Sequence, residues 1–460
     1  MKTRFILVCA CAALAGGFAT AGTAAEARPP NIVFILADDM GWNEVGYQGS
    51  TYYETPNIDR LAHRGVRFTD AYSAAPICSP TRAALMTGKY PARLHLTDYI
   101  PGRMWEDKPL VTPKMQQGLP LAEHTLPERL KPRGYATGLF GKWHLAADYE
   151  YKPNRPMDPE SQGFDTVFHT RKPEDEDITA KKPDAHNAIE ITDHALEFIH
   201  ANRARPFFCY VAHNVVHRPF GEDPALIEKY QRKSGAGRPE NHAIMAAMIE
   251  RMDRQIGRLL DALDTEGLAD RTIVVFYSDN GAVVADAAQA PFRGGKATLW
   301  EGGLRVPLAI HWPGVTRVDA VSHEPVVTTD LFFTLCDAAG APTGDLPRDG
   351  LSLGPHLRTA APLDRDAIYF HYPHYHHLGD MRPASVIRAG RYKLIEWHEG
   401  ALLGRGQAVS LFDLTADPGE QNDLAAAKPE LAAQLREKLR RWRESVGAQE
   451  MTVRGPRTRP

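Results

Sequence analysis

The sequence has little cysteine and no excess of charge of either sign, and each shortage excludes a class of protein. Its 54 Lys and Arg residues nearly balance 57 Asp and Glu, so the net charge is −3 and the basic face expected of a nucleic-acid binder is missing. Five cysteines in 460 residues are too few for a disulfide-stapled scaffold. With 43% hydrophobic and 24% charged residues, the composition is globular, not that of a disordered, collagenous or polytopic membrane protein.

An apolar run near the N-terminus predicts a signal peptide over residues 1–25. Two basic residues precede the run at 5–14, and small residues with two candidate cleavage tripeptides follow it. The run is too short to cross a membrane. We therefore expect an exported protein, periplasmic or secreted, without a membrane span. Lipoprotein anchoring through Cys9 or Cys11 is an alternative, but the residues before either cysteine suit it poorly.

Removal of that segment leaves three cysteines, Cys78, Cys209 and Cys336. Three cysteines cannot all pair within one chain, and a chain of this length needs no disulfide to hold its core. At least one of them therefore needs another reason to be present in an exported protein.

Four short apolar runs predict strands that are buried on both faces. Continuous apolar runs, as opposed to alternating ones, are typical of parallel sheets. Helical spacing of apolar residues occurs between them, over 186–202 and 241–263. Strands that alternate with helices predict an α/β fold, with a large mixed, mostly parallel sheet and helices on both faces. The runs cover residues 31–36, 136–140, 206–211 and 271–277.

Polar residues that can act as metal ligands, anion ligands or acid–base groups follow each of these runs. Ligands bind outside the carboxyl ends of parallel strands, so these residues are expected to converge on one site. In chain order they are Asp38 and Asp39, Lys142 and His144, His213 and His217, and Asp279 and Asn280.

The pattern changes after about residue 350. Short antiparallel strands are expected within 384–396 and 411–414, followed by an amphipathic helix over 428–446. The expected organisation is a larger domain over 28–350, a smaller α+β C-terminal domain over 351–448 and a disordered tail over 449–460.

Cys78 lies at the predicted start of a short helix. Ser79 is a candidate N-cap, Pro80 suits the first turn, and Gly88 suits the end. The amides and dipole of a helix N-terminus favour an anion beside Cys78, and Arg82 lies one turn further on. A small buried thiol with an incidental arginine is the structural alternative.

The string Cys78-Ser79-Pro80-Thr81-Arg82 resembles the Cys-x-Pro-x-Arg signature of type I sulfatases, in the alkaline phosphatase superfamily. The resemblance extends over most of residues 30–315 and into the C-terminal region. The further matching blocks are Asp38-Asp39, Gly141-Lys142-Trp143-His144, His217-Arg218-Pro219, Asp279-Asn280-Gly281, the stretch from Gly295 to Gly303, Leu411-Phe412-Asp413-Leu414 and Asp417-Pro418-Gly419-Glu420.

This resemblance implies a two-step hydrolysis of sulfate monoesters. Cys78 would be converted to formylglycine by a formylglycine-generating enzyme, and one hydroxyl of the hydrated aldehyde would attack sulfur and expel the alcohol. The second hydroxyl would then collapse to the aldehyde and release sulfate from the covalent enzyme sulfate. Splitting one difficult displacement into two steps is the general advantage of covalent catalysis.

Asp38, Asp39, Asp279 and Asn280 offer a set of oxygen ligands that suits Ca²⁺ or Mg²⁺. The alternative is that these residues only form turns, which they favour. The resemblance implies that all four, together with the modified Cys78, hold one divalent cation, most often calcium.

Arg82, Lys142 and Lys296 are candidate clamps for a sulfate anion, although a single lysine is usually a solvated surface charge. His144 and His217 are candidate acid–base groups because imidazole titrates near neutral pH. The resemblance implies that His144 takes a proton from the formylglycine hydroxyl and that His217, with Lys296, protonates the leaving alcohol. Asp279 is a candidate base besides its role as a ligand, and His213 is left as a structural or rim histidine.

A segment rich in His and Tyr, residues 369–377, is a candidate rim of the cleft and, alternatively, a second metal site. Within and near it, His374, His376 and Arg382 are candidate substrate contacts, together with Lys142, His217 and Lys296. Asp98 and Tyr99 form another candidate rim element. The expected substrate of an exported hydrolase of this kind is a sulfated polysaccharide or a glycosaminoglycan-type oligosaccharide.

Two alternative functions remain. A formylglycine beside a metal can also attack phosphorus, which allows a phosphate or phosphonate monoester hydrolase of the same superfamily. The other alternative is a non-catalytic carbohydrate-binding protein on a sulfatase scaffold. No expectation about the oligomeric state follows from the sequence.

Overall fold

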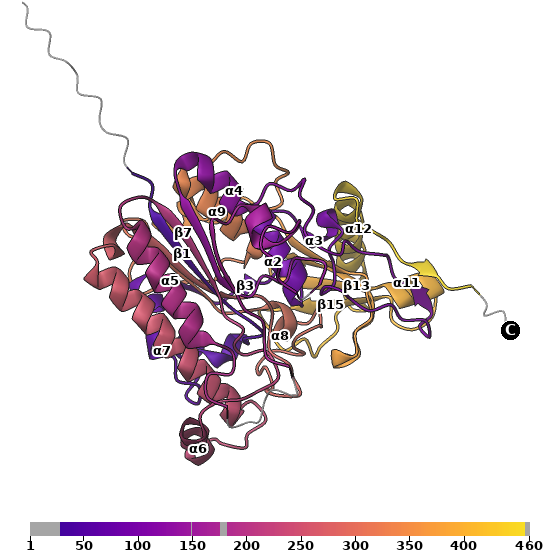
Figure 1. Ribbon diagram of the computed structural model, residues 1–460. Helices are drawn as coiled ribbons and strands as arrows, with labels where there is room; N and C mark the ends of the chain where they lie inside the picture. The colour runs from indigo at the N-terminus through magenta and orange to yellow at the C-terminus, as the bar shows by residue number, and fades with distance from the viewer. Residues whose placement is uncertain (1–27, 149, 175–181, 456–460) are drawn as a thin grey trace, which may run out of the picture.

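The computed structural model describes residues 28–148, 150–174 and 182–455 (Figure 1). The expected signal peptide at residues 1–25 lies outside these residues. Within the described ranges, no helix is both long enough and apolar enough to cross a membrane.

An eight-stranded sheet forms the centre of the fold, in the order β10-β2-β9-β8-β1-β7-β5-β6. Parallel pairs join β8, β1, β7, β5 and β6, whereas β9 runs antiparallel to both β8 and β2. The mixed, mostly parallel α/β sheet expected from the sequence is therefore confirmed. The strands are β1 Asn31–Ala37, β2 Val66–Phe68, β5 Ala136–Gly141, β6 Thr166–His169, β7 Phe207–Ala212, β8 Thr272–Ser278, β9 Leu308–His311 and β10 Ala320–Ser322.

Helices cover both faces of this sheet, which explains why the central strands are apolar throughout. Along β1, Phe34 and Leu36 enter one core and Val33 and Ile35 enter the other, and all are fully buried. In Figure 1, α5 and α7 lie against one face, and α2, α4 and α9 lie against the opposite face. The helices on the first face are α1 Pro56–Arg64, α5 Ala188–Asn202, α6 Pro224–Arg232 and α7 Ala243–Thr265; those on the second are α2 Cys78–Thr87, α4 Leu126–Leu130 and α9 Thr328–Ala339.

A second, four-stranded antiparallel sheet lies in the C-terminal part, as expected. Its order is β12-β13-β14-β15, and the terminal helix α12 (Pro429–Ser445) packs on it through Leu435, Leu439 and Trp442. The ring of Trp442 stacks on Tyr369 with 4.8 Å between the centroids. The strands are β12 Ile368–Tyr372, β13 Ala384–Ala389, β14 Tyr392–Trp397 and β15 Val409–Asp413.

Smaller elements complete the chain. They are β3 Ala71–Tyr72, which pairs with β11 Val326–Val327; α3 Pro91–Leu94; α8 Glu301–Leu304; α10 Gly354–Thr359; and α11 His398–Leu403.

The expectation of a disordered tail from residue 449 is wrong as far as residue 455. There, β16 (Thr452–Val453) pairs with β4 (Leu110–Val111), and Met451 is buried. His371 Nε2 also lies 2.9 Å from the Gln449 carbonyl oxygen. These partners are distant in the sequence, 78 residues for His371 and about 340 for β4, so the polar composition of the tail alone could not reveal them.

A buried ion cluster joins the C-terminal sheet to helix α8. Lys393 on β14 places its Nζ 2.9 Å from Glu301 Oε1 and 2.8 Å from Glu420 Oε1, and all three side chains are almost completely shielded from solvent. The Glu301 backbone N–H also donates to Glu420. Glu301 begins α8 and follows the loop that carries Lys296, so this cluster ties that loop to the C-terminal sheet.

Replacing Lys393 with methionine should lower the free energy of unfolding by about 3–5 kcal/mol, because it leaves two buried carboxylates without their cation. Urea denaturation measures this change. Lys438→Met is the control, since Lys438 forms an exposed pair with Asp366 that is worth about 0–1 kcal/mol. Equal losses in the two variants would show that the buried cluster contributes no special stability.

Candidate active site

The polar residues expected to converge do meet at one edge of the sheet. Asp38 and Asp39 follow β1, Asp279 and Asn280 follow β8, and Lys142 follows β5. These strands are parallel to one another, so their carboxyl ends lie side by side. Gly141 allows the close approach at the end of β5, since it has φ +108° and an added Cβ would lie 2.0 Å from the Ala212 carbonyl oxygen.

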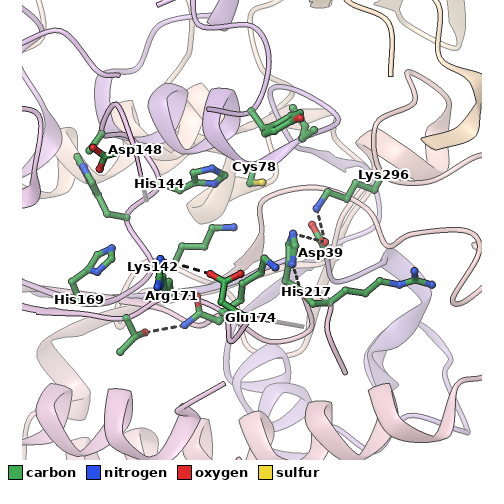
Figure 2. A pocket seen from close by; sticks show the side chains of 18 of the residues that line it. Asp39, Cys78, Lys142, His144, Asp148, His169, Arg171, Glu174, His217 and Lys296 are labelled. Atoms are coloured by element: carbon green, nitrogen blue, oxygen red, sulfur yellow. Dashed lines mark hydrogen bonds and ion pairs between the residues drawn. The ribbon is translucent and has the colours of Figure 1, made fainter. Parts of the chain in front are cut away.

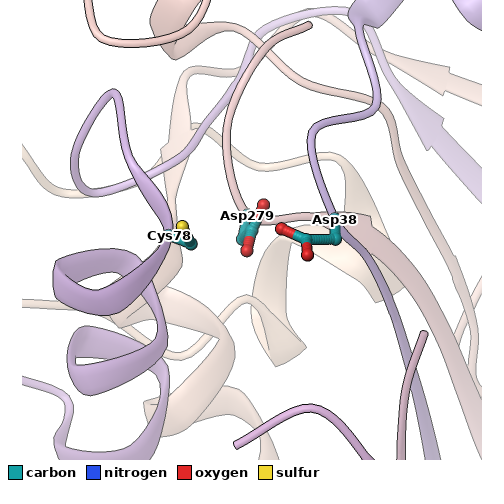
Figure 3. Close-up of side chains that lie close together, drawn as sticks. All are labelled: Asp38, Cys78 and Asp279. Atoms are coloured by element: carbon teal, nitrogen blue, oxygen red, sulfur yellow. The ribbon is translucent and has the colours of Figure 1, made fainter. Parts of the chain in front are cut away.

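Cys78 is the first residue of α2 and is buried in this edge (Figure 3). Its Sγ and one carboxylate oxygen each from Asp38 and Asp279 all lie within 4.8 Å of one another. Burial raises the pKa of the Cys78 thiol. The cysteine is therefore held next to two carboxylates and is not an isolated core thiol.

The expected cap of this helix is wrong, whereas its expected end is confirmed. Ile77 is the N-cap residue, and the Ser79 hydroxyl instead accepts a hydrogen bond from the Ile100 N–H at 3.1 Å. Gly88 ends the helix in the left-handed region with φ +68°. Ser79 thus anchors a neighbouring loop and is not available to cap its own helix.

Three buried cations surround the carboxylates. Lys142 Nζ lies 2.7 Å from Asp38 Oδ2. Lys296 Nζ lies 2.6 Å from Asp39 Oδ2 (Figure 2). Arg82 does not reach back to Cys78; its Nε donates to Asp279 Oδ2 at 2.9 Å.

These cations decide the charge of two of the carboxylates. Burial by itself raises the pKa of Asp38, but Lys142 and its other positive neighbours outweigh burial and lower it well below its usual range. Burial likewise raises the pKa of Asp39, and Lys296 reverses the direction. Both carboxylates are therefore ionised, and the site holds fixed charges of both signs.

The donor set fits a hard divalent cation. Asp38 Oδ1 and Asn280 Oδ1 are buried and lack hydrogen-bond partners among the residues that the structure describes. Burial, and then the neighbouring Asp38, raises the pKa of Asp279 to about 6, as expected for crowded carboxylates without a cation between them. Oxygen atoms of this kind are the ligands that Ca²⁺ and Mg²⁺ prefer.

Asp39 is engaged differently from the other candidate ligands. Its Oδ2 contacts Lys296, and its Oδ1 accepts a hydrogen bond from Asn280 Nδ2 at 2.7 Å. Its φ of +64° lies in the left-handed region that non-glycine residues rarely adopt. His144 and Ala297, in the same site, also lie in this region. Three such residues in one site indicate a backbone shaped for function and not only for stability.

Both acid–base candidates lie in the site with defined ring orientations. His217 Nδ1–H donates to the Arg218 carbonyl at 2.6 Å, which leaves the Nε2 lone pair, 3.6 Å from Asp39 Oδ2, on the side of the site. His144 Nε2–H donates to the Ile100 carbonyl at 3.0 Å. Burial and then Lys296 lower the pKa of His217 to about 4, and burial and then Lys142 lower that of His144.

A cavity of about 500 Å³ opens above these groups (Figure 2). Its inner end is lined by Cys78, Lys142, His144, His217 and Lys296. Its outer part is lined by residues that sequence reasoning missed, among them Asp148, His169, Arg171, Lys172 and Glu174. The only sequence signal for them is the short strand β6, which lies at the edge of the sheet and has no long apolar run.

The predicted rim residues divide into two groups. Tyr99 and His376 line the cavity, as expected. His374 is only 3% exposed, and its Nε2 lies 2.7 Å from Thr97 Oγ1. Arg382 lies over the ring of Trp397. Neither residue is among those that line the cavity. The expected substrate contacts of His374 and Arg382 are therefore not supported by their positions.

The remaining candidates are interior residues. Asp98 is buried and accepts a hydrogen bond from the Tyr372 hydroxyl at 2.8 Å, and His213 is fully buried. In the described part of the chain, the one cluster of metal-ligating side chains is that of Asp38, Cys78 and Asp279, so the His-rich segment 369–377 forms no second metal site there.

Family models match nearly the whole described chain. Residues 30–341 match the model "Sulfatase", and residues 295–445 match "N-sulphoglucosamine sulphohydrolase, C-terminal". These ranges contain every candidate catalytic and metal-binding residue named above.

Several named proteins are similar over most of their length. Arylsulfatase A of Homo sapiens is 32% identical, with 91% of this chain and 89% of that protein covered. N-acetylgalactosamine-6-sulfatase of Homo sapiens is also 32% identical, with coverages of 89% and 84%. The crystal structure of Ps i-CgsB in complex with k-i-k-neocarrahexaose superposes with a TM-score of 0.75 at 26% identity, over 90% of this chain and 93% of that one. The chain therefore belongs to the sulfatase family of the alkaline phosphatase superfamily and is a sulfuric ester hydrolase.

Proposed function

We propose that this sulfatase hydrolyses sulfate monoesters of sulfated carbohydrates, with a formylglycine made from Cys78 as its nucleophile. The observation that carries the proposal is the position of Cys78 at the bottom of a cavity, beside two carboxylates and within a ring of buried cations. A carbohydrate substrate is supported by the similarity to N-acetylgalactosamine-6-sulfatase and to a structure that holds a neocarrahexaose.

Two groups complete this site when present. Formylglycine would supply a hydrated aldehyde, with one hydroxyl as the nucleophile and a second hydroxyl whose collapse to the aldehyde would release sulfate. A divalent cation, which we propose to be Ca²⁺ with Mg²⁺ as the alternative, supplies Lewis acidity towards a sulfate oxygen. Asp38, Asp279 and Asn280 would hold it together with residue 78, and Asp39 would join them.

The side chains of this chain bind the sulfate and move protons. Lys142 and Lys296 bind the sulfate oxygens, because fixed ammonium groups stabilise the charge that develops on them. Arg82 fixes the Asp279 carboxylate through its Nε–H. His144 would take a proton from the formylglycine hydroxyl when the sulfated intermediate is converted, and His217, together with Lys296, would protonate the leaving alcohol. Asp279 is a second candidate base.

We further propose that the protein is exported and matures with a formylglycine-generating enzyme. The basic and apolar residues at the N-terminus support export to the periplasm or the medium.

Parallel assays of 4-nitrophenyl sulfate, 4-nitrophenyl phosphate and a panel of sulfated oligosaccharides test this function. Turnover of sulfate esters well above phosphate esters, with release of inorganic sulfate from at least one oligosaccharide, supports it. Faster turnover of the phosphate ester would favour the phosphomonoesterase alternative. Oligosaccharide binding without any turnover would favour the carbohydrate-binding alternative.

His217→Ala should harm substrates with poor leaving groups most. We expect a loss of about 10²–10⁴-fold in kcat for a sugar sulfate, the scale of general acid catalysis, and a much smaller loss for 4-nitrophenyl sulfate. The comparison of kcat for the two substrates measures this, with the exposed His200→Ala as control. Equal losses for both substrates would remove the general-acid role of His217.

A further inference from the structure

The outer part of the cavity is built by the segment that follows β6, the edge strand of the central sheet. β6 pairs in parallel with β5, and His169 lies opposite Gly141 in the register. The next residue, Thr170, donates its N–H to the Gly141 carbonyl oxygen at 3.0 Å, and its hydroxyl accepts from Asn214 Nδ2 at 2.9 Å. Thr170 is therefore fixed beside Lys142 at the spacing of neighbouring strands, about 4.8 Å.

Two further residues of chain bring Lys172 to the same cavity. Two residues span at most about 7 Å, so the Lys172 backbone lies no more than about 12 Å from that of Lys142. Electrostatics agrees with this placement. Burial is the main cause that lowers the pKa of His186 to about 4, and Lys172 contributes to the same shift. His186 Nε2 lies 2.8 Å from the carbonyl oxygen of His217, so the charge of Lys172 acts close to the leaving-group side.

Three acidic residues of the outer cavity, Asp148, Glu150 and Asp158, have cationic partners outside it. Arg155 contacts Asp148 at 2.9 Å and Asp158 at 2.7 Å, and Lys152 contacts Glu150 at 3.1 Å. Neither Arg155 nor Lys152 is among the lining residues. The negative charge of these three residues is therefore neutralised by cations that do not line the cavity.

The cations of the outer cavity are balanced less completely. Arg218 is paired with Asp286, and Arg171 contacts Glu174 only at 3.7 Å, between two exposed side chains. Lys172 is half-buried and has no ion pair with any residue in the described ranges. A partly desolvated ammonium group that forms no ion pair with the described residues of a substrate cavity is a candidate site for an anion.

We propose that Lys172, with Arg171 beside it, binds a second anionic group of the substrate, a carboxylate or a sulfate. This inference rests on the proposed function, because it places that group on the sulfated carbohydrate whose ester lies between Lys142 and Lys296. The cavity of about 500 Å³ has the size of a pocket for a whole small ligand, and not only for a sulfate group. The backbones of Lys142 and Lys172 lie no more than about 12 Å apart and both side chains line the same cavity, so one carbohydrate ligand can present an anionic group to each of them. The preferred substrate is therefore a carbohydrate with at least two anionic groups.

Competitive inhibition of 4-nitrophenyl sulfate hydrolysis tests this subsite. One arm compares an unsaturated chondroitin 6-sulfate disaccharide, which has a sulfate and a carboxylate, with its methyl ester, which has lost the charge of the carboxylate. A second arm compares a neocarrabiose that carries two sulfates with a neocarrabiose that carries one. In the native enzyme the second anion should lower Ki about 10-fold in at least one arm, as expected for one charge-assisted hydrogen bond. The arm that responds identifies the carboxylate or the sulfate as the ligand.

In each variant, the readout is the Ki of the ligand with one anionic group divided by the Ki of the ligand with two. Lys172→Gln should bring this ratio close to one, and Lys172→Arg should retain it. Lys152→Gln removes the same charge near the same cavity and should leave the ratio unchanged, since Lys152 is exposed and paired with Glu150. A ratio of one in the native enzyme, or an equal ratio in the native enzyme and Lys172→Gln, overturns the second subsite while leaving the sulfatase activity standing. Absence of any sulfate ester hydrolysis overturns the proposed function and this inference together.

Discussion

Replacing Cys78 with alanine should abolish sulfate ester hydrolysis, with a loss in kcat of about 10⁴-fold or more, the scale on which removal of a catalytic nucleophile acts. The structure gives no substitute nucleophile at this position, because Cys78 Sγ occupies the place beside Asp38 and Asp279 at the start of α2. The fold should survive, since only one small buried atom is removed, at a cost of about 1 kcal/mol in the free energy of unfolding. Activity with 4-nitrophenyl sulfate and urea denaturation measure the two effects.

Cys336→Ala is the matched control, because Cys336 is an equally buried cysteine on α9, outside the cavity. It should lose a similar amount of stability and keep its activity. The mass of the tryptic peptide over residues 68–82, taken from active native protein, completes the experiment. An aldehyde in place of the thiol is the expected result. Full activity with an unmodified thiol, or in Cys78→Ala, would exclude the formylglycine nucleophile.

The strands and the catalytic constellation are predictable because both leave local signals in the sequence. A strand buried on both faces must be apolar throughout, and β1 and β8 show this directly. The parallel order then forces the residues after each strand to one edge, which is why Asp38, Lys142 and Asp279 meet as expected.

The predictions that were wrong concern residues whose contact partners are distant in the sequence. Ser79 has the composition of an N-cap, yet its hydroxyl is taken by Ile100. His374 belongs to a segment that reads as a polar rim, yet Thr97 holds it in the interior. The outer wall around Lys172 was missed because a four-residue edge strand carries almost no periodicity. Tertiary contacts override local preference in each case, and no single-sequence pattern reports them.

Removal of the divalent cation should cost about 10²–10³-fold in activity, since Lewis-acid stabilisation of a reacting oxyanion is worth several kcal/mol. A readout that does not depend on turnover is thermal stability. Calcium at 100 times its Kd should add about 2.7 kcal/mol to the free energy of unfolding, because only the folded chain brings the ligands together. Metal analysis of the native protein, and differential scanning calorimetry after chelation and on re-addition of calcium or magnesium, measure both the content and the shift.

Asp279→Asn separates metal binding from a general stabilising effect of calcium. The variant keeps an oxygen that can accept from Arg82 but loses one of the crowded charges that a cation would neutralise. It should therefore lose most of the calcium-induced shift, whereas Asp345→Asn, which alters an exposed pair with Arg129, should keep it. An equal shift in both variants, or none in the native protein with any divalent cation, would contradict a metal site at this edge. In that case Asp38 Oδ1, which has only the ion pair with Arg82 Nη2 at 3.7 Å, and Asn280 Oδ1 would each need a hydrogen-bond donor, because buried oxygen atoms without one are costly to any fold.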